Sequence, residues 1–107
     1  MKYNNKKTEY KNEIYDSKLE ARYAKYLDLL KASGQIKTWE RQVKFDLVVN
    51  DVKVTSYRAD FVVTDNGNHQ EIHECKGIET GVWRIKRKLF MSLYPTFNIR
   101  IITKDNI

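Results

Sequence analysis

The spacing of apolar residues changes along this chain of 107 residues, and the changes define the order of its elements. Apolar side chains first recur at the spacing of one helical face, at Leu19, Tyr23, Tyr26, Leu27 and Leu30. Between residues 43 and 76 they alternate with polar residues, which is typical of strands. A helical spacing returns at 82–93, and a short apolar run follows at 97–103. The sequence therefore predicts one helix, three strands, a second helix and a fourth strand.

Local signals define the boundaries. Ser17 and Glu20 have the spacing of a capping box at the start of the first helix, and Gly34 is suited to its end. Turn sequences separate the first three predicted strands, which cover residues 42–49, 54–64 and 70–76. A short hairpin is expected at 8–15, and Pro95 closes the second helix. We expect a basic tail at 1–7 and a single domain at 8–107.

Connection lengths predict the topology. Tight turns make the three consecutive strands antiparallel, whereas a crossover helix adds the fourth strand in parallel. The expected fold class is α/β, a helix–three strands–helix–strand core (αβββαβ) with a mixed sheet and flanking helices. Alternation in the second strand places one set of residues on one face: Tyr57, Ala59, Phe61 and Val63. The apolar face of the second helix is marked by Val82, Ile85, Leu89 and Leu93, with Trp83 and Phe90 also expected in the core.

Composition excludes several classes of protein. No apolar run approaches the roughly 20 residues of a membrane-spanning helix, and the polar N-terminal residues lack the apolar stretch of a secretory signal. The single cysteine, Cys75, excludes an internal disulfide framework and favours a reducing compartment. We therefore expect a cytoplasmic protein with no membrane partner and no nucleotide cofactor.

The net charge of +6 is unevenly distributed. Residues 1–41 carry ten basic and six acidic side chains, residues 42–75 carry three and six, and residues 76–107 carry seven and two. Basic ends suit a polyanion such as nucleic acid, and an acidic middle third suits a bound cation. Within that third, Asp60 and Glu74 lie inside predicted strands, whereas the other acids look like turn or surface charges.

Asp60, Glu74 and Lys76 are expected to converge at one end of the sheet. Alternation places Glu74 and Lys76 on one face about 7 Å apart, and the tight turn sets Asp60 opposite roughly residue 73. His73 and Cys75 face the other way. Two carboxylates suit Mg²⁺, which lowers the pKa of a bound water, and a lysine can stabilise charge on a phosphate. The main-chain carbonyl of Cys75 is a further candidate ligand.

The segment RADF at 58–61 followed by ECKG at 74–77 resembles the motif of the PD-(D/E)XK nuclease superfamily. The helix that begins with SxxEA at 17–21 and the strand at Gln42 are similar to its N-terminal half, so the likeness runs from about residue 6 to residue 102. Within the superfamily the chain most resembles a small phage-encoded family of otherwise unknown function. Alanine stands where the name of the motif has proline.

The resemblance implies a restriction-endonuclease-like fold, a Mg²⁺ cofactor that Mn²⁺ can replace, and hydrolysis of DNA phosphodiester bonds. It assigns catalytic roles to Asp60, Glu74, Lys76 and Glu20. The three carboxylates among them, together with Cys75, are the expected metal ligands. Gln42 has a supporting role in this assignment.

Cations near the motif are expected to hold DNA. The run RIKRK at 84–88 has four cations in five residues and is a candidate phosphate track. The predicted DNA-binding residues are Gln42, Lys44, Arg58, Arg84, Lys86, Arg87 and Lys88, with the amine of Lys86 directed toward Glu74. The expected function is a Mg²⁺-dependent endodeoxyribonuclease of phage DNA metabolism in a bacterial host, selective for branched or junction DNA. A homodimer is expected because 107 residues offer little surface to wrap a duplex.

Simpler explanations stay open. Asp60 and Glu74 fit ordinary ion pairs of a strand, Glu20 fits the helix cap alone, and residues 84–88 fit a solvated helix face. A zinc site is rejected because the chain has neither a fourth ligand nor CxxC spacing. The alternative functions are a catalytically silent nucleic-acid-binding module on a nuclease-like fold and a phage structural protein.

Overall fold

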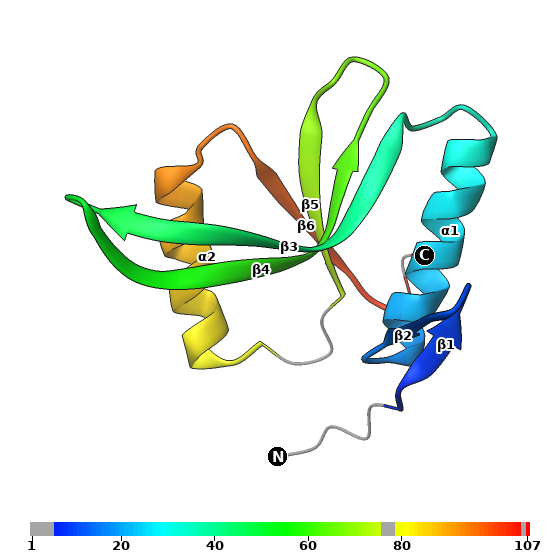
Figure 1. Ribbon diagram of the computed structural model, residues 1–107, viewed down its shortest axis with the longest axis horizontal. Coiled ribbons are helices and arrows are strands. Elements are labelled where there is room, and N and C mark those ends of the chain that lie inside the picture. The colour runs from blue at the N-terminus through cyan, green and yellow to red at the C-terminus, as the bar shows by residue number, and fades with distance from the viewer. Residues whose placement is uncertain (1–5, 76–78, 106) are drawn as a thin grey trace.

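The computed structural model describes residues 6–75, 79–105 and 107, and its elements follow the predicted order (Figure 1). The helices are α1 (Lys18–Ala32) and α2 (Gly81–Leu93). The strands are β1 (Thr8–Tyr10), β2 (Glu13–Tyr15), β3 (Thr38–Val49), β4 (Val52–Thr64), β5 (Gln70–Cys75) and β6 (Asn98–Ile102). The α/β fold class and the hairpin at 8–15 are confirmed. Most of the predicted tail, residues 1–5, lies outside the described residues.

Four strands form one sheet in the order β3-β4-β5-β6. Neighbours are antiparallel except β5 and β6, which are parallel and joined through α2, as predicted. In the described part of the chain, β5 pairs with β4 only over residues 61–64. We call residues 43–59 the outer ribbon, since there β3 and β4 extend beyond that pairing (Figure 1). The β1–β2 hairpin forms a separate small sheet near α1.

The helix α1 starts and ends where the sequence predicts. The Ser17 side chain caps it, and Gly34 follows its end with a φ of +79° that glycine adopts without strain. Its buried face differs from the prediction, because Tyr26 is 38% exposed while Ala21 and Ala24 are buried. The buried side of α1 therefore includes both alanines, and Tyr26 lies outside it.

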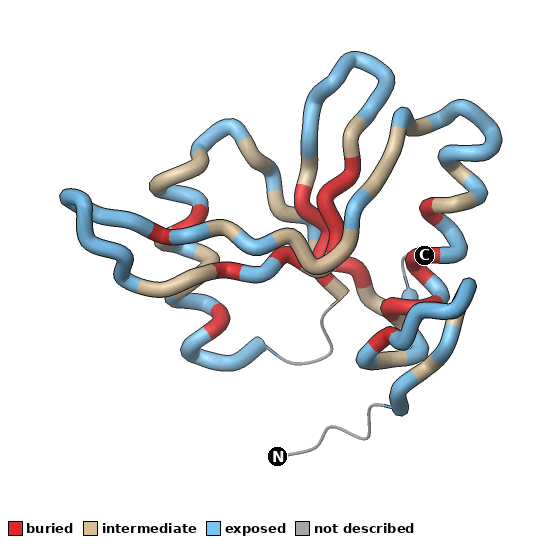
Figure 2. The backbone as a smooth tube through the Cα atoms, in the orientation of Figure 1, coloured by how far each residue is buried: buried red, intermediate tan, exposed pale blue. Residues whose placement is uncertain are grey.

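Two separate hydrophobic clusters stabilise the fold. Under α1, Phe61 and Val63 of β4 pack with Tyr23 and Leu27. Under α2, Tyr57 and Ala59 of the same strand pack with Phe90. Figure 2 shows buried segments of the backbone near both helices. The four residues predicted to share one face of β4 are all buried, but they divide between the two clusters and so do not share a face.

The change of face occurs at one point of the β3–β4 pair. The register pairs Arg41 with Phe61 and Val43 with Ala59, so Gln42 and Asp60 lie opposite each other between them. Gln42 has a φ of +53°, in the left-handed region that a residue with a side chain rarely adopts. A left-handed residue breaks the regular pleat, so that side chains before and after it no longer share a face. Asp60 thus lies where the strand turns from one cluster to the other.

The helix α2 is rotated relative to the prediction. Val82 and Ile85, expected in the core, are 66% and 69% exposed, whereas Trp83 and Phe90 are buried as expected. Phe90 lies in an aromatic cluster with ring centroids 5.0 Å from Phe45 and 4.9 Å from Tyr57. These large rings offer more contact area than the aliphatic stripe, so they determine which face meets the sheet.

Candidate functional site

Asp60 and Glu74 meet where β4 and β5 lie side by side. Phe61 pairs with His73, so one step further along the register sets Asp60 opposite Glu74, within one residue of the predicted pairing. Glu74 Oε2 accepts the backbone N–H of Asp60 at 3.3 Å, and Asp60 Oδ2 accepts the backbone N–H of Cys75 at 2.9 Å. Each carboxylate therefore bonds the backbone of the other's strand, and this exchange holds the two together.

Tyr57 provides another bond to Glu74, and sequence reasoning did not single it out. Its hydroxyl donates to Glu74 Oε2, and the two side chains are only 2% and 1% exposed. Burial, and then the Glu74 carboxylate, raise the pKa of Tyr57 above its ordinary value, so the hydroxyl stays a donor. A buried carboxylate needs such donors to offset its loss of solvation. Tyr57 is thus a positioning group for Glu74.

Glu20 lies in the first turn of α1 and is 7% exposed. Its backbone N–H donates to Ser17 Oγ at 3.1 Å, which confirms the predicted N-cap. Burial, and after it the charges of the Asp60 and Asp16 carboxylates, raise the pKa of Glu20 to about 7, against smaller opposing effects of Arg41 and the Ser17 bond. Glu20 therefore takes part in the helix cap and also lies near Asp60.

Arg41 and Gln42 lie beside these carboxylates, at the point where the face of the β3–β4 pair changes. Arg41 donates to Glu13 Oε1 at 3.1 Å and to the Ile14 carbonyl at 3.2 Å, and its guanidinium lies 3.9 Å from the centre of the Tyr15 ring. These contacts fix its position near α1. Gln42, a predicted supporting residue, is half-buried opposite Asp60.

Asp60 and Glu74 form a pair with Glu20 nearby, and the three do not make a complete set of metal ligands. Across residues 6–75, 79–105 and 107, no group of three or more His, Cys, Asp or Glu side chains could hold a metal ion. The predicted catalytic Lys76 lies outside the described residues. Cys75 is half-buried, and its side chain packs against the cluster under α1.

The predicted DNA-binding cations divide between two sides of the outer ribbon. Lys44 and Arg58 are exposed and lie directly opposite each other on β3 and β4. Arg84 and Lys88 are exposed on α2, and Arg84 pairs with Glu79 at 3.7 Å.

Two cations of the predicted phosphate track on α2 are half-buried. One is Arg87, whose guanidinium lies 5.7 Å from the centre of the Trp83 ring. Its charge acts to lower the pKa of Tyr57, so Arg87 lies near the Tyr57–Glu74 bond. Lys86 is half-buried as well, and its predicted approach to Glu74 stays a prediction.

His73 faces α1, away from Glu74, as predicted. Its Nδ1 lies 2.6 Å from the Tyr23 hydroxyl, and its Nε2 lies 3.0 Å from Glu71 Oε1. Burial lowers the pKa of His73 below its ordinary value. Both ring nitrogens are therefore satisfied by neighbours within the fold.

The chain matches the family described as "Protein of unknown function (DUF1064)" over residues 1–106. It belongs to this family. Neither the curated proteins nor the solved structures include a match. In this family member, no helix in the described part of the chain is long and apolar enough to cross a membrane.

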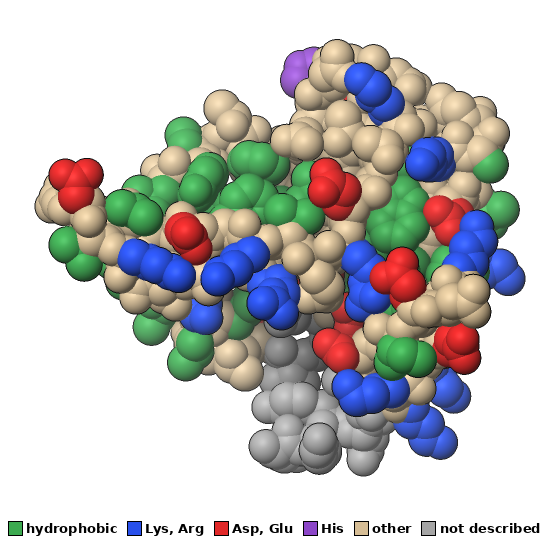
Figure 3. Space-filling model, in the orientation of Figure 1, with side chains coloured by type: hydrophobic (Ala, Val, Ile, Leu, Met, Phe, Trp, Pro, Cys, Tyr) green, Lys and Arg blue, Asp and Glu red, His purple; other side chains and the backbone are tan. Residues whose placement is uncertain are grey.

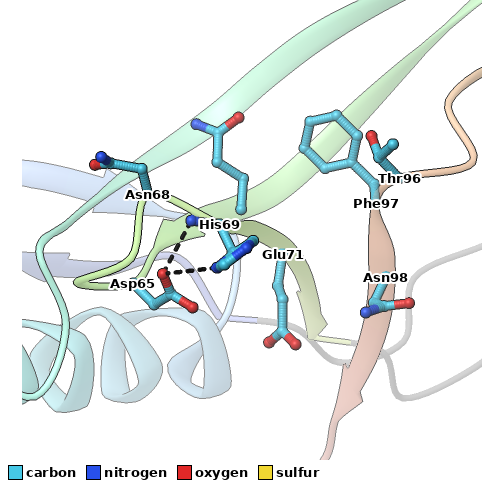
Figure 4. Close-up of a pocket in the computed structure, with 8 residues that line it drawn as sticks. Asp65, Asn68, His69, Glu71, Thr96, Phe97 and Asn98 are labelled. Atoms are coloured by element: carbon cyan, nitrogen blue, oxygen red, sulfur yellow. Dashed lines mark hydrogen bonds and ion pairs between the residues drawn. The ribbon is translucent and has the colours of Figure 1, made fainter.

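Two hollows of the DUF1064 fold lie apart from the carboxylate pair. The larger, of about 370 Å³, lies between the β4–β5 turn and the start of β6 (Figure 4). Asp65 Oδ1 accepts the backbone N–H of His69 there at 2.9 Å and stands 3.6 Å from its Nδ1. The second, of about 210 Å³, is lined by Tyr23, His73 and Arg100 among others. Neither lining includes Asp60 or Glu74.

Proposed function

We propose that this DUF1064 protein is a metal-dependent endodeoxyribonuclease that hydrolyses DNA phosphodiester bonds, as its resemblance to PD-(D/E)XK nucleases suggests. The observation that carries the proposal is the Asp60–Glu74 pair. Two carboxylates from neighbouring strands each accept a backbone N–H of the other's strand, and one of them is almost fully buried. A mere surface ion pair would not require the Tyr57 hydroxyl and a backbone N–H to hold Glu74 in place.

The donor chemistry fits Mg²⁺, with Mn²⁺ as a substitute. Asp60 and Glu74 offer hard carboxylate oxygens, and waters would complete the shell of the ion. Glu20 and the Cys75 carbonyl are further candidate ligands. A bound Mg²⁺ would supply a water of lowered pKa and offset charge on the phosphate. The pKa of Glu20 is raised to about 7 beside the Asp60 carboxylate, and a nearby cation would favour the ionised form of Glu20. Lys76 is assigned to the stabilisation of the phosphate charge.

Several finer features belong to the same proposal. The substrate is branched or junction DNA, which a homodimer with two active sites can cut on two strands. The protein acts in phage DNA metabolism in the cytoplasm of a bacterial host. Basic chain ends around an acidic centre support DNA as the partner.

The test is cleavage of branched and linear DNA with Mg²⁺, with Mn²⁺ and with EDTA. We expect cleavage by the wild type with either metal, and none with EDTA or with Glu74→Ala or Lys76→Ala. Glu74→Gln is the matched variant, because its amide oxygen still accepts from Tyr57 while the charge is lost. Equal inertness of the wild type and all variants on every substrate would contradict the proposal.

A second candidate is a nucleic-acid-binding module without turnover. It is favoured by the lack, among the described residues, of a group of three side chains that could hold a metal. It predicts salt-sensitive DNA binding that is unchanged by Mg²⁺ and no cutting under any condition.

A further inference from the structure

The two faces of the outer ribbon have different surroundings. On one face, α2 packs through Phe90 against Tyr57 and Phe45. The other face carries Lys44 and Arg58, both exposed. Figure 3 views this second face, where Lys and Arg side chains follow one another along β3 and β4. The ribbon thus presents cations on the side away from α2.

The packing of the chain does not account for the Lys44–Arg58 pair. Like charges directly opposite each other on neighbouring strands destabilise a sheet. Neither residue forms an ion pair with a carboxylate in the described part of the chain. The carboxylate of Asp46 pairs instead with Lys53 at 3.4 Å. An anion from outside the chain is the partner that would relieve this repulsion.

The cation pair is continuous with the candidate site. Arg58 precedes Asp60 by two residues, and Lys44 follows Gln42 by two. Each therefore lies about 7 Å along its strand from the point where the face of the β3–β4 pair changes. We propose that the face of the outer ribbon away from α2 binds the phosphate backbone of double-stranded DNA and leads one strand to Asp60 and Glu74. This inference rests on the proposed function and specifies the surface and the form of its substrate.

The choice of duplex over single strand rests on the aromatic side chains. Proteins that bind single strands stack the bases on exposed aromatic rings. Among the aromatic side chains that the structure describes, only Tyr26 on α1 is exposed. The aromatic rings of the ribbon, Phe45 and Tyr57, pack under α2. A surface of phosphate-binding cations without stacking platforms fits a duplex, and it reads no base sequence.

The α2 cations do not belong to this surface. Trp83 and Phe90 form the buried side of α2, so the exposed Arg84 and Lys88 point away from the ribbon. Arg84 also already pairs with Glu79. The helix therefore offers a control with the same change of charge on the opposite side of the ribbon.

The experiment compares two double variants of the full chain, Lys44→Gln/Arg58→Gln and Arg84→Gln/Lys88→Gln. Binding to a short labelled duplex is measured by fluorescence anisotropy in EDTA at several salt concentrations. Each phosphate contact contributes about 0.9 to the slope of log K against log salt, so losing two lowers the slope by about 2. At about 0.1 M salt the same two contacts correspond to a loss of roughly 60-fold in affinity.

We expect this loss in the ribbon variant, a change below about threefold in the α2 variant, and tighter binding of the duplex than of oligo-dT. Equal losses in the two variants, a larger loss in the α2 variant, tighter binding of oligo-dT, or no duplex binding by the wild type would each overturn the inference. Thermal unfolding checks folding, since removing the like-charge pair should leave the melting temperature unchanged or raised. Because binding is measured without metal, the result stands apart from the cleavage assay of the proposed function.

Discussion

The bond from Tyr57 to Glu74 can be tested directly with Tyr57→Phe. The substitution removes one hydroxyl and leaves the ring in its cluster with Phe90. Both partners are almost fully buried, at 2% and 1% exposure, so water cannot replace the lost donor. Glu74 keeps the backbone N–H of Asp60 at 3.3 Å, a long bond that compensates little.

The expected loss follows from the chemistry of the bond. A hydrogen bond to a charged group contributes about 1.5–3 kcal/mol, and a buried acceptor left without its donor adds a desolvation penalty. We expect the free energy of unfolding to fall by about 2 kcal/mol, which lowers the melting temperature by roughly 10 °C in a domain of this size. Urea unfolding at neutral pH in EDTA measures the change, with a constant m-value as a check on the native and denatured states.

Tyr94→Phe is the matched control. The Tyr94 hydroxyl donates to the Asp46 carbonyl at 3.1 Å in an exposed position, where water can take its place. The same chemical change there should alter stability by less than about 0.5 kcal/mol. If the two variants lose equal stability, or if Tyr57→Phe matches the wild type, the Tyr57 hydroxyl does not hold the Glu74 carboxylate and the reasoning fails.

Three further outcomes are expected. Burial raises the pKa of Glu20 from 4.5 to about 7, so the folded state keeps the Glu20 proton to a higher pH than the unfolded state does. The stability of the wild type relative to Glu20→Gln in EDTA should therefore decrease from about pH 4.5 to about pH 7 and stay constant above. A pH-independent difference in urea unfolding would contradict this. Gln42→Gly should be neutral or stabilise by up to about 1 kcal/mol, while Gln42→Val should destabilise by about 1–2 kcal/mol, as thermal unfolding can show. Ser17→Ala should lose about 1 kcal/mol of stability in the same assay, and an unchanged midpoint would argue against the cap.

Local sequence signals predicted the order of elements because each acts within a few residues. The Ser17 cap and Gly34 each require a particular backbone conformation at one position. The pairing of Asp60 near Glu74 followed from the length of the β4–β5 turn and strand geometry alone. These parts of the candidate site depend on the number of residues between two positions, so the sequence alone was enough to predict them.

The role of Tyr57 could not be predicted from alternation. Strict alternation places Tyr57 and Asp60 on opposite faces of β4, and nothing in the residue type of Gln42 indicates a left-handed backbone. The rotation of α2 was missed for a related reason. Its apolar arc is wide enough to include both Val82 and Trp83, and only the aromatic residues of β3 and β4 select between them.

The division of the core into two clusters has a consequence for the opening motions of the protein. A two-stranded ribbon is at best marginally stable alone, so the outer ribbon depends on α2 to stay ordered. We expect α2 and the outer ribbon to open as one cooperative unit while α1, β5 and β6 remain folded. Amide hydrogens of residues 53–58 should then exchange faster than those of 61–64, and each such opening would detach Tyr57 from Glu74.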